Sequence, residues 1–340
     1  MAKYVLKRLL YILLIFIILS MLMYLLYNSI GFDRARWLAD AQKDAFKNNP
    51  EGLEALYQKY RVEMGLDKNI FQRYLMWIGL MPLNGKFQGM LQGNFGVSYG
   101  NLQKPVLEVI KEPMQNTVIL NLFATIIALA VTIPLGIFCA VKRGTKRDTA
   151  VQAFSVIGYS LPTFIIAIVF IYLFAIVLPI FPPMGSSTYG ASYTGARALV
   201  DRLYYMLLPL IVMTFCSLGG MTRYVRSSMI EALSMDCIRT ARAKGLKERI
   251  VIYSHAWRNA LVPIVTLVIG WFIGIFSGSV MIENIFALNG AGRLYITALQ
   301  TNDNDLILTL QMFYVVIGLL GNLIIDILYG LIDPRIRVNK

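Results

Sequence analysis

Six apolar runs, each close to or above the length needed to cross a lipid bilayer, constrain what this chain can fold into. A membrane helix needs about 20 consecutive, mostly apolar residues, because the hydrocarbon core offers no water to pair with the backbone. The sequence therefore predicts an all-α, polytopic membrane protein with six transmembrane helices. The runs occupy residues 9–27, 114–141, 149–178, 203–221, 261–281 and 306–331.

Composition and charge distribution agree with a membrane protein. Charged residues make up 15% of the chain and hydrophobic residues 57%, whereas soluble domains carry roughly 25% charged residues. The net charge of +13 is compatible with nucleic-acid binding, but the sequence holds no nucleic-acid motif or basic patch interleaved with aromatic residues. The basic residues instead lie in short segments beside apolar runs, as membrane topology requires.

The segment between the first two runs is soluble in character. Residues 31–113 hold eleven Lys or Arg and nine Asp or Glu. Residues 33–47 and 51–64 are predicted to be helices separated by Asn48-Asn49-Pro50. The glycine-rich residues 89–100 lack the Gly-Lys-Ser/Thr of a phosphate loop and are interpreted as a structural turn. We therefore expect an extracytoplasmic helical insertion, residues 29–113, after a first part, residues 1–28, formed by the cytoplasmic N-terminus and the first transmembrane helix.

Basic residues also predict the orientation. With the N-terminus inside, four inner segments hold 18 Lys or Arg, and the two short outer loops hold 3. This asymmetry predicts that both termini are cytoplasmic, and a long outer segment such as residues 31–113 is exempt from the rule. The first run has 19 residues, longer than the apolar part of a signal peptide, and is interpreted as a retained span.

A basic stretch, residues 236–263, separates the fourth and fifth runs. Gly245 is expected to end one short helix before a second begins. Beyond it, four apolar residues recur at i, i+4, i+7 and i+11, which predicts one apolar face of a helix that lies along a surface or docks on a partner. These residues are Leu246, Ile250, Tyr253 and Trp257. A solvated loop held inside by its charge is the simpler alternative.

The basic stretch resembles the cytoplasmic loop of permease subunits of ABC importers. Residues 239–246 and 255–263 are similar to the branch that handles oligopeptides, dipeptides and nickel, and specifically to its first-permease, oligopeptide-type B subunit. The general signature of these importers begins Glu-Ala-Ala ahead of a glycine. This chain has Arg239-Thr240-Ala241 at those positions, so only Ala241 and Gly245 are identical to the signature. Residues 283–287 and 328–337 also resemble the family, whereas residues 28–64 match it poorly.

The resemblance implies that this loop, within residues 223–260 of a five-helix permease core at 114–340, is the coupling helix that enters a groove on an ATPase subunit. The implied cations for docking are Arg242 and Lys244, and the small residues Ala241, Ala243 and Gly245 allow close approach. The whole implied coupling set is Arg239, Thr240, Ala241, Arg242, Ala243, Lys244, Gly245 and Leu246. Implied partners are a second homologous permease in a heterodimer, two ABC ATPases, an extracytoplasmic substrate-binding protein and the lipid bilayer, without nucleic acid.

The sequence offers no catalytic, cofactor or metal motif. It contains no GxxxxGK[ST] loop, so ATP and Mg²⁺ are expected on partner ATPases and the chain itself is not expected to be an enzyme. Cys139, Cys216 and Cys237 are too scattered for a zinc site or disulfide framework. His255 is the single histidine, so an intramembrane hydrolase is disfavoured. Residues of the substrate path are not identified.

The resulting functional prediction is the transmembrane permease subunit of an ATP-driven importer in the cytoplasmic membrane, moving oligopeptides or dipeptides. Nickel or oligosaccharide import on the same architecture, and an ATP-independent channel, are the alternatives.

Local signals add expectations within the spans. Pro134 and Pro162 are expected to kink the second and third spans. Gly219-Gly220 predicts close helix approach, and glycines at 270, 274 and 278 predict contact with the second permease subunit or within this chain. Asp326 is expected to pair with an inner cation or reach water.

Overall fold

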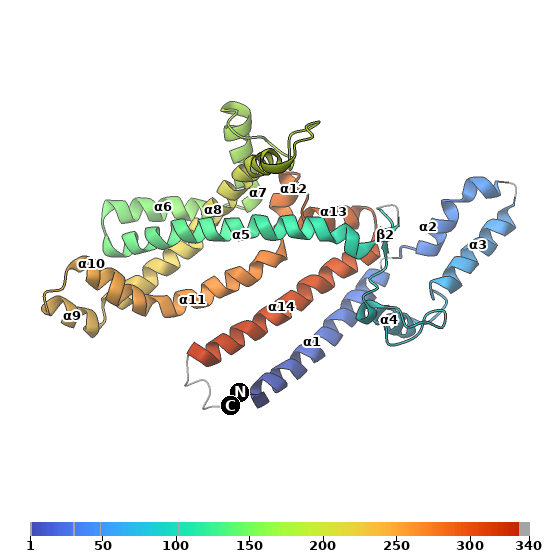
Figure 1. Cartoon of the computed structure of the whole chain (residues 1–340), viewed down its shortest axis with the longest axis horizontal. Helices are drawn as coiled ribbons and strands as arrows, with labels where there is room; N and C mark the ends of the chain where they lie inside the picture. Colours follow the sequence, from blue (N-terminus) through green and yellow to red (C-terminus); the bar gives the residue numbers. More distant parts are fainter. Residues whose placement is uncertain (1, 30, 48, 101–102, 333–340) are drawn as a thin grey trace. The chain divides into compact units, whose positions relative to one another are not determined.

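The computed structural model describes residues 2–29, 31–47, 49–100 and 103–332, and their regular secondary structure is almost entirely helical (Figure 1). Five helices have the length and apolarity of membrane spans, and a bent pair supplies a sixth if it is counted as one span. The predicted all-α membrane architecture is confirmed. The matching segments are Leu6–Ser29, Val106–Val141, Gly195–Leu233, Glu248–Ser277 and Asn304–Ile327, with Lys146–Ser160 and Thr163–Val177 as the bent pair.

The chain forms two compact units, Met1–Lys111 with Thr297–Leu319, and Glu112–Ile296 with Leu320–Lys340. The chain ends and residues 333–337 of the family-like closing segment lie outside the described residues, so the predicted cytoplasmic position of the termini stays a prediction.

The first unit contains α1 to α4 and the start of α14. The bounds are α1 (Ala2–Ser29), α2 (Arg34–Asp40), a 3₁₀ turn (Lys43–Phe46), α3 (Pro50–Glu63), α4 (Ile70–Ile78) and α14 (Asn304–Ile332). The predicted helix break before α3 is confirmed, because the Asn49 side chain accepts a hydrogen bond from the Gly52 N–H at 2.9 Å and Pro50 begins the helix. Tyr24, Tyr74 and Leu308 join α1, α4 and α14 in one buried cluster.

The glycine-rich residues 89–100 form turns, as expected, and are fastened to the start of α14. A short 3₁₀ turn (Met90–Gln92) precedes a two-residue antiparallel pair, β1 (Val97–Ser98) and β2 (Lys104–Pro105). The buried Ser98 hydroxyl donates to Asp303 Oδ2 at 2.6 Å, and the Gly100 N–H donates to the same oxygen at 3.2 Å. This carboxylate holds a segment about 200 residues away in sequence, a pairing that no local pattern reveals.

The second unit begins within α5 and contains α6 to α12, most of α13 and the end of α14. The bounds are α5 (Val106–Val141), α6 (Lys146–Ser160), α7 (Thr163–Ile171) with a π-helical turn (Tyr172–Val177), α8 (Gly195–Leu233), α9 (Asp236–Ala243), α10 (Glu248–Ile250) with a π-helical turn (Val251–Ala256), α11 (Trp257–Gly274) with a 3₁₀ turn (Ile275–Ser277), α12 (Val280–Ile285) and α13 (Ala291–Gln300). Within this unit α8 packs on α6, α7 and α11.

Helix α8 is longer than the predicted fourth span at 203–221, because it continues past the apolar run to Leu233. The basic extension is tied to α6: Arg226 Nε and Nη2 donate to the two oxygens of the buried Asp148 carboxylate at 2.9 and 2.8 Å. Close helix approach at Gly219 is confirmed, since a Cβ there would collide with Tyr159 and the Ser155 carbonyl oxygen. Gly220 faces open space.

The third predicted span is broken rather than kinked. Helices α6 and α7 meet at an angle of 103°, and Pro162 is the residue that precedes α7. Leu161 adopts an extended conformation (φ −87°, ψ 139°), which proline favours in the residue before it. Pro134, in contrast, lies inside the unbroken α5. The Asp326 side chain on α14 is half-buried.

Candidate functional site

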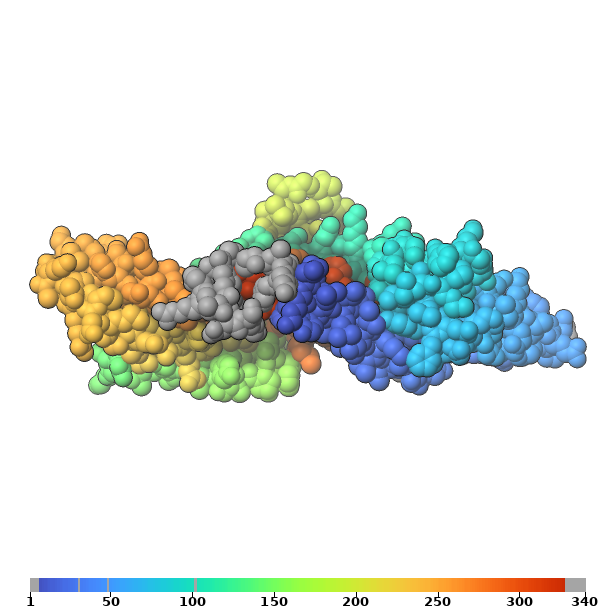
Figure 2. Space-filling model, turned by 90° about the horizontal axis from the view of Figure 1, so that it is seen from below, coloured from blue at the N-terminus to red at the C-terminus, as the bar shows by residue number. Residues whose placement is uncertain are grey.

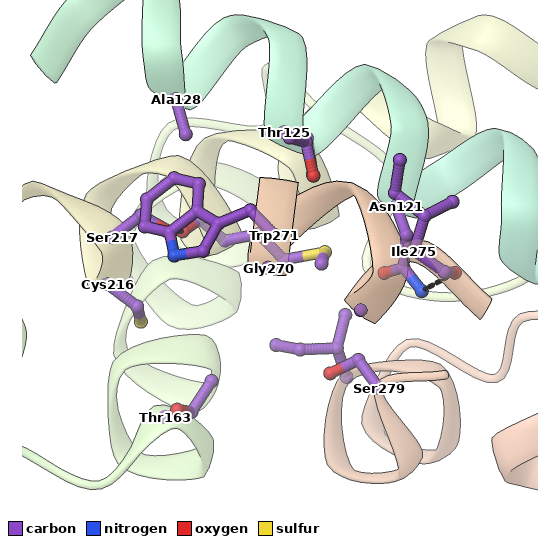
Figure 3. A pocket seen from close by; sticks show the side chains of 14 residues that line it. Asn121, Thr125, Ala128, Thr163, Cys216, Ser217, Gly270, Trp271, Ile275 and Ser279 are labelled. Atoms are coloured by element: carbon purple, nitrogen blue, oxygen red, sulfur yellow. Dashed lines mark hydrogen bonds between the residues drawn. The ribbon is translucent and has the colours of Figure 1, made fainter. Parts of the chain in front are cut away.

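An uncharged cavity of about 380 Å³ lies among α5, α7, α8, α11 and α12 of the second unit (Figure 3). We call it the second-unit cavity. No Asp, Glu, His, Lys or Arg side chain lines it; its polar groups are hydroxyls, one amide, one thiol and one indole. The lining residues are Asn121, Ala124, Thr125, Ala128, Thr163, Met213, Cys216, Ser217, Gly270, Trp271, Gly274, Ile275, Ser279 and Ile282. The sequence identified none of them as a path residue.

Two glycines of α11 keep this cavity open. A Cβ on Gly270 or Gly274 would meet no atom of the described chain within 4 Å. Of the two alternatives, close packing at these glycines within this chain is therefore not found among the described residues, and contact with a second subunit stays a prediction. Gly278 does not share their helix face, because it lies beyond α11 with a φ of +68°.

The end of α11 is held to α5 by an amide. The Asn121 Nδ2 group donates to the Ile275 carbonyl oxygen at 2.8 Å, where α11 passes into its 3₁₀ turn (Figure 3). A carbonyl at a helix end lacks its regular partner, and in an apolar environment leaving it unpaired costs several kcal/mol. Asn121 thus fixes the backbone that forms one wall of the cavity.

A fully buried carboxylate, Glu283, organises the elements beside the cavity. It accepts hydrogen bonds from Thr117 Oγ1 at 2.8 Å and from the backbone N–H groups of Gly292, Ser279 and Arg293 at 2.6, 3.3 and 3.3 Å. Burial raises the pKa of the Glu283 carboxyl, although these hydrogen bonds act in the opposite direction. The carboxylate joins α5, α12 and the start of α13, and so positions the cavity residue Ser279.

The predicted coupling stretch folds as two helices separated by Gly245, as expected. Gly245 has a φ of +73°, the left-handed conformation that glycine adopts at little cost. Its N–H donates to the Arg242 carbonyl at 2.9 Å, and the Leu246 N–H donates to the Ala241 carbonyl at 3.3 Å. These two bonds close the end of α9, after which α10 continues through a π-helical turn into α11.

The side chains of the coupling stretch divide into an anchored set and an exposed set. Ile238 and Ala241 are buried in a hydrophobic cluster with residues of α5, α8 and α11, so Ala241 is not available for the close approach expected of it. Arg242 donates to the Glu248 carboxylate at 2.6 and 3.2 Å, which braces the turn around Gly245. The exposed members are Arg239, Thr240, Arg242, Ala243, Lys244, Gly245 and Leu246.

The four residues of the predicted apolar face do not share one continuous helix face, because Leu246 lies in the turn before α10 and Trp257 packs against the buried cluster. Docking of the exposed residues of this face on a partner stays a prediction. Leu246, Ile250 and Tyr253 are 38%, 42% and 55% exposed. The π-helical turn at Val251–Ala256 has i→i+5 bonds, which interrupt the 3.6-residue period on which the prediction relied. The buried face consists instead of Val251, Ile252, Ala256, Ala260 and Ile264.

Within the second unit, α9 and α10 lie at the opposite end of α8 and α11 from α12 (Figure 1). A short, exposed, basic helix therefore stands beyond one end of the long helices. The sequence and these helices together define a polytopic membrane protein.

Comparison with known proteins identifies the family. The model of the binding-protein-dependent transport system inner membrane component matches residues 132–338, and the N-terminal model of the same membrane components matches residues 1–121. The chain belongs to this family. It is a non-catalytic permease subunit of a binding-protein-dependent ABC importer, a multi-pass protein of an inner-membrane transporter whose ATP is bound by partner ATPases.

Similar proteins align over most or all of their length. The chain is 34% identical over 340 residues to the oligopeptide transport system permease protein AppB of Bacillus subtilis (strain 168), covering 99% of this chain and 100% of that protein. It is 31% identical to the dipeptide transport system permease protein DppB of Lactococcus lactis, with the same coverage. The DppB of Escherichia coli (strain K12) is 36% identical over 296 residues, 82% of this chain and 84% of that protein.

Replacing the buried carboxylate tests its positioning role. Both oxygens of the Glu283 carboxylate accept hydrogen bonds, and Glu283→Gln replaces one of these oxygens with an NH₂ group, which is a donor. At least one buried N–H or O–H group therefore loses its acceptor. We expect a loss of about 1–3 kcal/mol in stability, measured as a lower thermal unfolding midpoint of the purified importer complex. Glu112→Gln removes an exposed carboxylate from α5 and should leave the midpoint unchanged. An equal midpoint for both variants would contradict the role given to Glu283.

Proposed function

We propose that this permease moves oligopeptides or dipeptides across the cytoplasmic membrane. The observation that carries the proposal is the set of relatives named as oligopeptide and dipeptide permeases, two of which align over their full length. The second-unit cavity supports it. Its hydroxyl and amide groups, including Asn121 and Thr125, can exchange hydrogen bonds with a peptide backbone, and no charge favours one kind of side chain.

The proposed assembly pairs this chain with a second, homologous permease subunit, two ABC ATPases and an extracytoplasmic substrate-binding protein. Residues 1–28 would be the cytoplasmic N-terminus and first span, residues 29–113 the extracytoplasmic domain, and residues 114–340 the permease core with its coupling loop at 223–260. Both termini are then cytoplasmic. The charge asymmetry of the short loops supports this orientation.

Helix α9 and the turn after it are proposed as the contact with an ATPase. Their anchoring supports this role: Ile238 and Ala241 fix α9 to the cluster that α8 and α11 share. Lys244 is exposed and makes no ion pair among the described residues, so its charge is open to an acidic partner. Closure of the ATPases would move α9 and, through the packed cluster, bias the spans between inward-open and outward-open states.

ATP-driven peptide uptake is the direct test of the function. Membrane vesicles that contain the chain with its co-purified partners and binding protein should accumulate labelled dipeptides and oligopeptides when ATP is supplied to the ATPases, and not in its absence. Accumulation of nickel or an oligosaccharide in place of peptides would contradict the proposed substrate. Uptake without ATP would contradict the importer mechanism.

A larger residue at Gly270 tests the second-unit cavity as part of the path. Gly270→Leu should fill open space, because no described atom lies within 4 Å of an added Cβ. We expect peptide uptake to fall by about tenfold or more while the second permease still co-purifies. Gly318→Leu is the matched control, since Gly318 is also an open glycine within a helix. Loss of co-purification would assign Gly270 to the subunit interface instead.

A β-branched residue at Gly245 tests coupling. Gly245→Val forces a left-handed backbone conformation that costs on the order of 1–2 kcal/mol, so the turn beside α9 should shift. We expect ATP hydrolysis to persist and uptake to drop by about tenfold. Gly190→Val is the matched control. Gly190 has a φ of +72° in the loop before α8 and, like Gly245, has room for an added side chain, so this variant imposes the same strain and should leave uptake unchanged. Normal uptake by Gly245→Val would refute the coupling assignment.

A further inference from the structure

A second cavity, of about 280 Å³, lies within the first unit. We call it the first-unit cavity. Its walls come from α1, α2, α4, the turns at 83–99 and the first turn of α14. The groups that matter for binding are two guanidiniums, one carboxylate and three large aromatic rings, namely Arg34, Arg73, Asp305, Tyr24, Trp77 and Tyr99.

Arg73 supplies a cation without a carboxylate partner. Its Nη2 group donates to the neutral Asn28 Oδ1 at 2.6 Å, and its Nε lies buried without a hydrogen-bond partner. Among the described residues, no carboxylate forms an ion pair with Arg73. A buried N–H donor without an acceptor is unfavourable, so an incoming acceptor would be stabilised there.

Arg34 adds a second cation to the lining. Its Nη1 lies 2.5 Å from Asp305 Oδ1, and its Cζ lies 6.0 Å from the centroid of the Tyr99 ring. Arg34 and Arg73 line the same cavity as the Tyr24 ring. With Asp305 as the single acidic side chain in the lining, the cavity keeps a net positive charge.

The cavity lies at the end of two span-length helices. Tyr24 and Asn28 belong to the last turns of the span Leu6–Ser29, and Asp305 belongs to the first turn of the span Asn304–Ile327. Tyr and Trp concentrate at this level of a bilayer, where lipid headgroups lie. A cavity placed there is within reach of a phosphate attached to a lipid.

An apolar stripe of α1 is open as far as Ile17 and stops short of Tyr24, because Ser20 is fully buried and Tyr24 is only 6% exposed. Leu10, Leu13 and Ile17 precede Tyr24 at helical spacing and are 60%, 55% and 43% exposed. Figure 2 shows α1, in dark blue, next to the segment around α4 of the same unit. An acyl chain lying along this stripe would bring its headgroup toward the end of α1 that carries the cavity.

We propose that the first-unit cavity binds the phosphate headgroup of an anionic phospholipid, with Arg73 and Arg34 as its donors. Guanidinium groups bind phosphate oxygens through paired, charge-assisted hydrogen bonds. A zwitterionic headgroup fits less well, because its ammonium needs an acidic partner and Asp305 is already bound by Arg34. A peptide carboxylate has related chemistry, but it does not account for the apolar stripe.

The test uses the purified importer complex with a photoactivatable phosphatidylglycerol, and mass spectrometry locates the crosslinks. We expect crosslinks within residues 64–99, displaced by unlabelled phosphatidylglycerol at about tenfold lower concentration than by phosphatidylcholine. Arg73→Gln should weaken this labelling by about tenfold or more, and Arg73→Lys should retain part of it. Lys86→Gln, which removes an exposed cation near the cavity but not in its lining, should label like the wild type.

Four results would overturn the proposal. The first two are unchanged labelling of Arg73→Gln and equal displacement of the photoactivatable lipid by phosphatidylglycerol and phosphatidylcholine. The third is displacement of that lipid by inorganic phosphate but not by phosphatidylglycerol. The fourth is displacement by an acidic dipeptide alone, which would indicate a peptide site. The unfolding midpoint of Arg73→Gln without lipid shows whether the variant is folded. If it is not, the competition between the two lipids on the wild-type complex decides.

Discussion

Irregular backbone in this protein depends on buried carboxylates. Within a membrane protein, backbone groups that leave a helix cannot rely on water and must be paired by the protein itself. Glu283 pairs N–H groups at the start of α13, Asp303 pairs that of Gly100, and Asp148 pairs that of Gly144 while binding Arg226. Each carboxylate therefore lies where a long helix begins or where two helices are joined. Removing any of them would leave several donors unpaired at once, which makes these positions more sensitive than the apolar spans around them.

The sequence predicted the helical spans well because the signal for a span is local. A run of about 20 apolar residues has one solution in a bilayer, and the helix break at Asn49-Pro50 and the turn at Gly245 follow from equally local backbone preferences. The carboxylate contacts could not be predicted. Thr117 and Glu283 are separated by 166 residues, and only folding brings them together. The cavity residues gave no signal for the same reason.

The errors have identifiable physical causes. Pro162 carries a signal for a bend, but the size of the bend depends on how α6 and α7 pack against α8, which the sequence does not state. The apolar face after Gly245 was predicted from a 3.6-residue period, which the π-helical turn at Val251–Ala256 interrupts, so Trp257 packs inward whereas Tyr253 is exposed. Ala241 matched the family signature literally, yet its side chain packs inward. A match identifies which residues occur together and not which way they face.

The uncharged lining of the second-unit cavity has a consequence for selectivity. In a site of low dielectric constant, one fixed charge would favour substrates of the opposite charge by several kcal/mol and exclude the others. Hydroxyls, an amide and small side chains impose no such preference, and the backbone groups they can bind are common to all peptides. Under the proposed function, a path of this kind accepts peptides of differing side chains. Discrimination between cargoes then has to occur before the permease, where the binding protein delivers them.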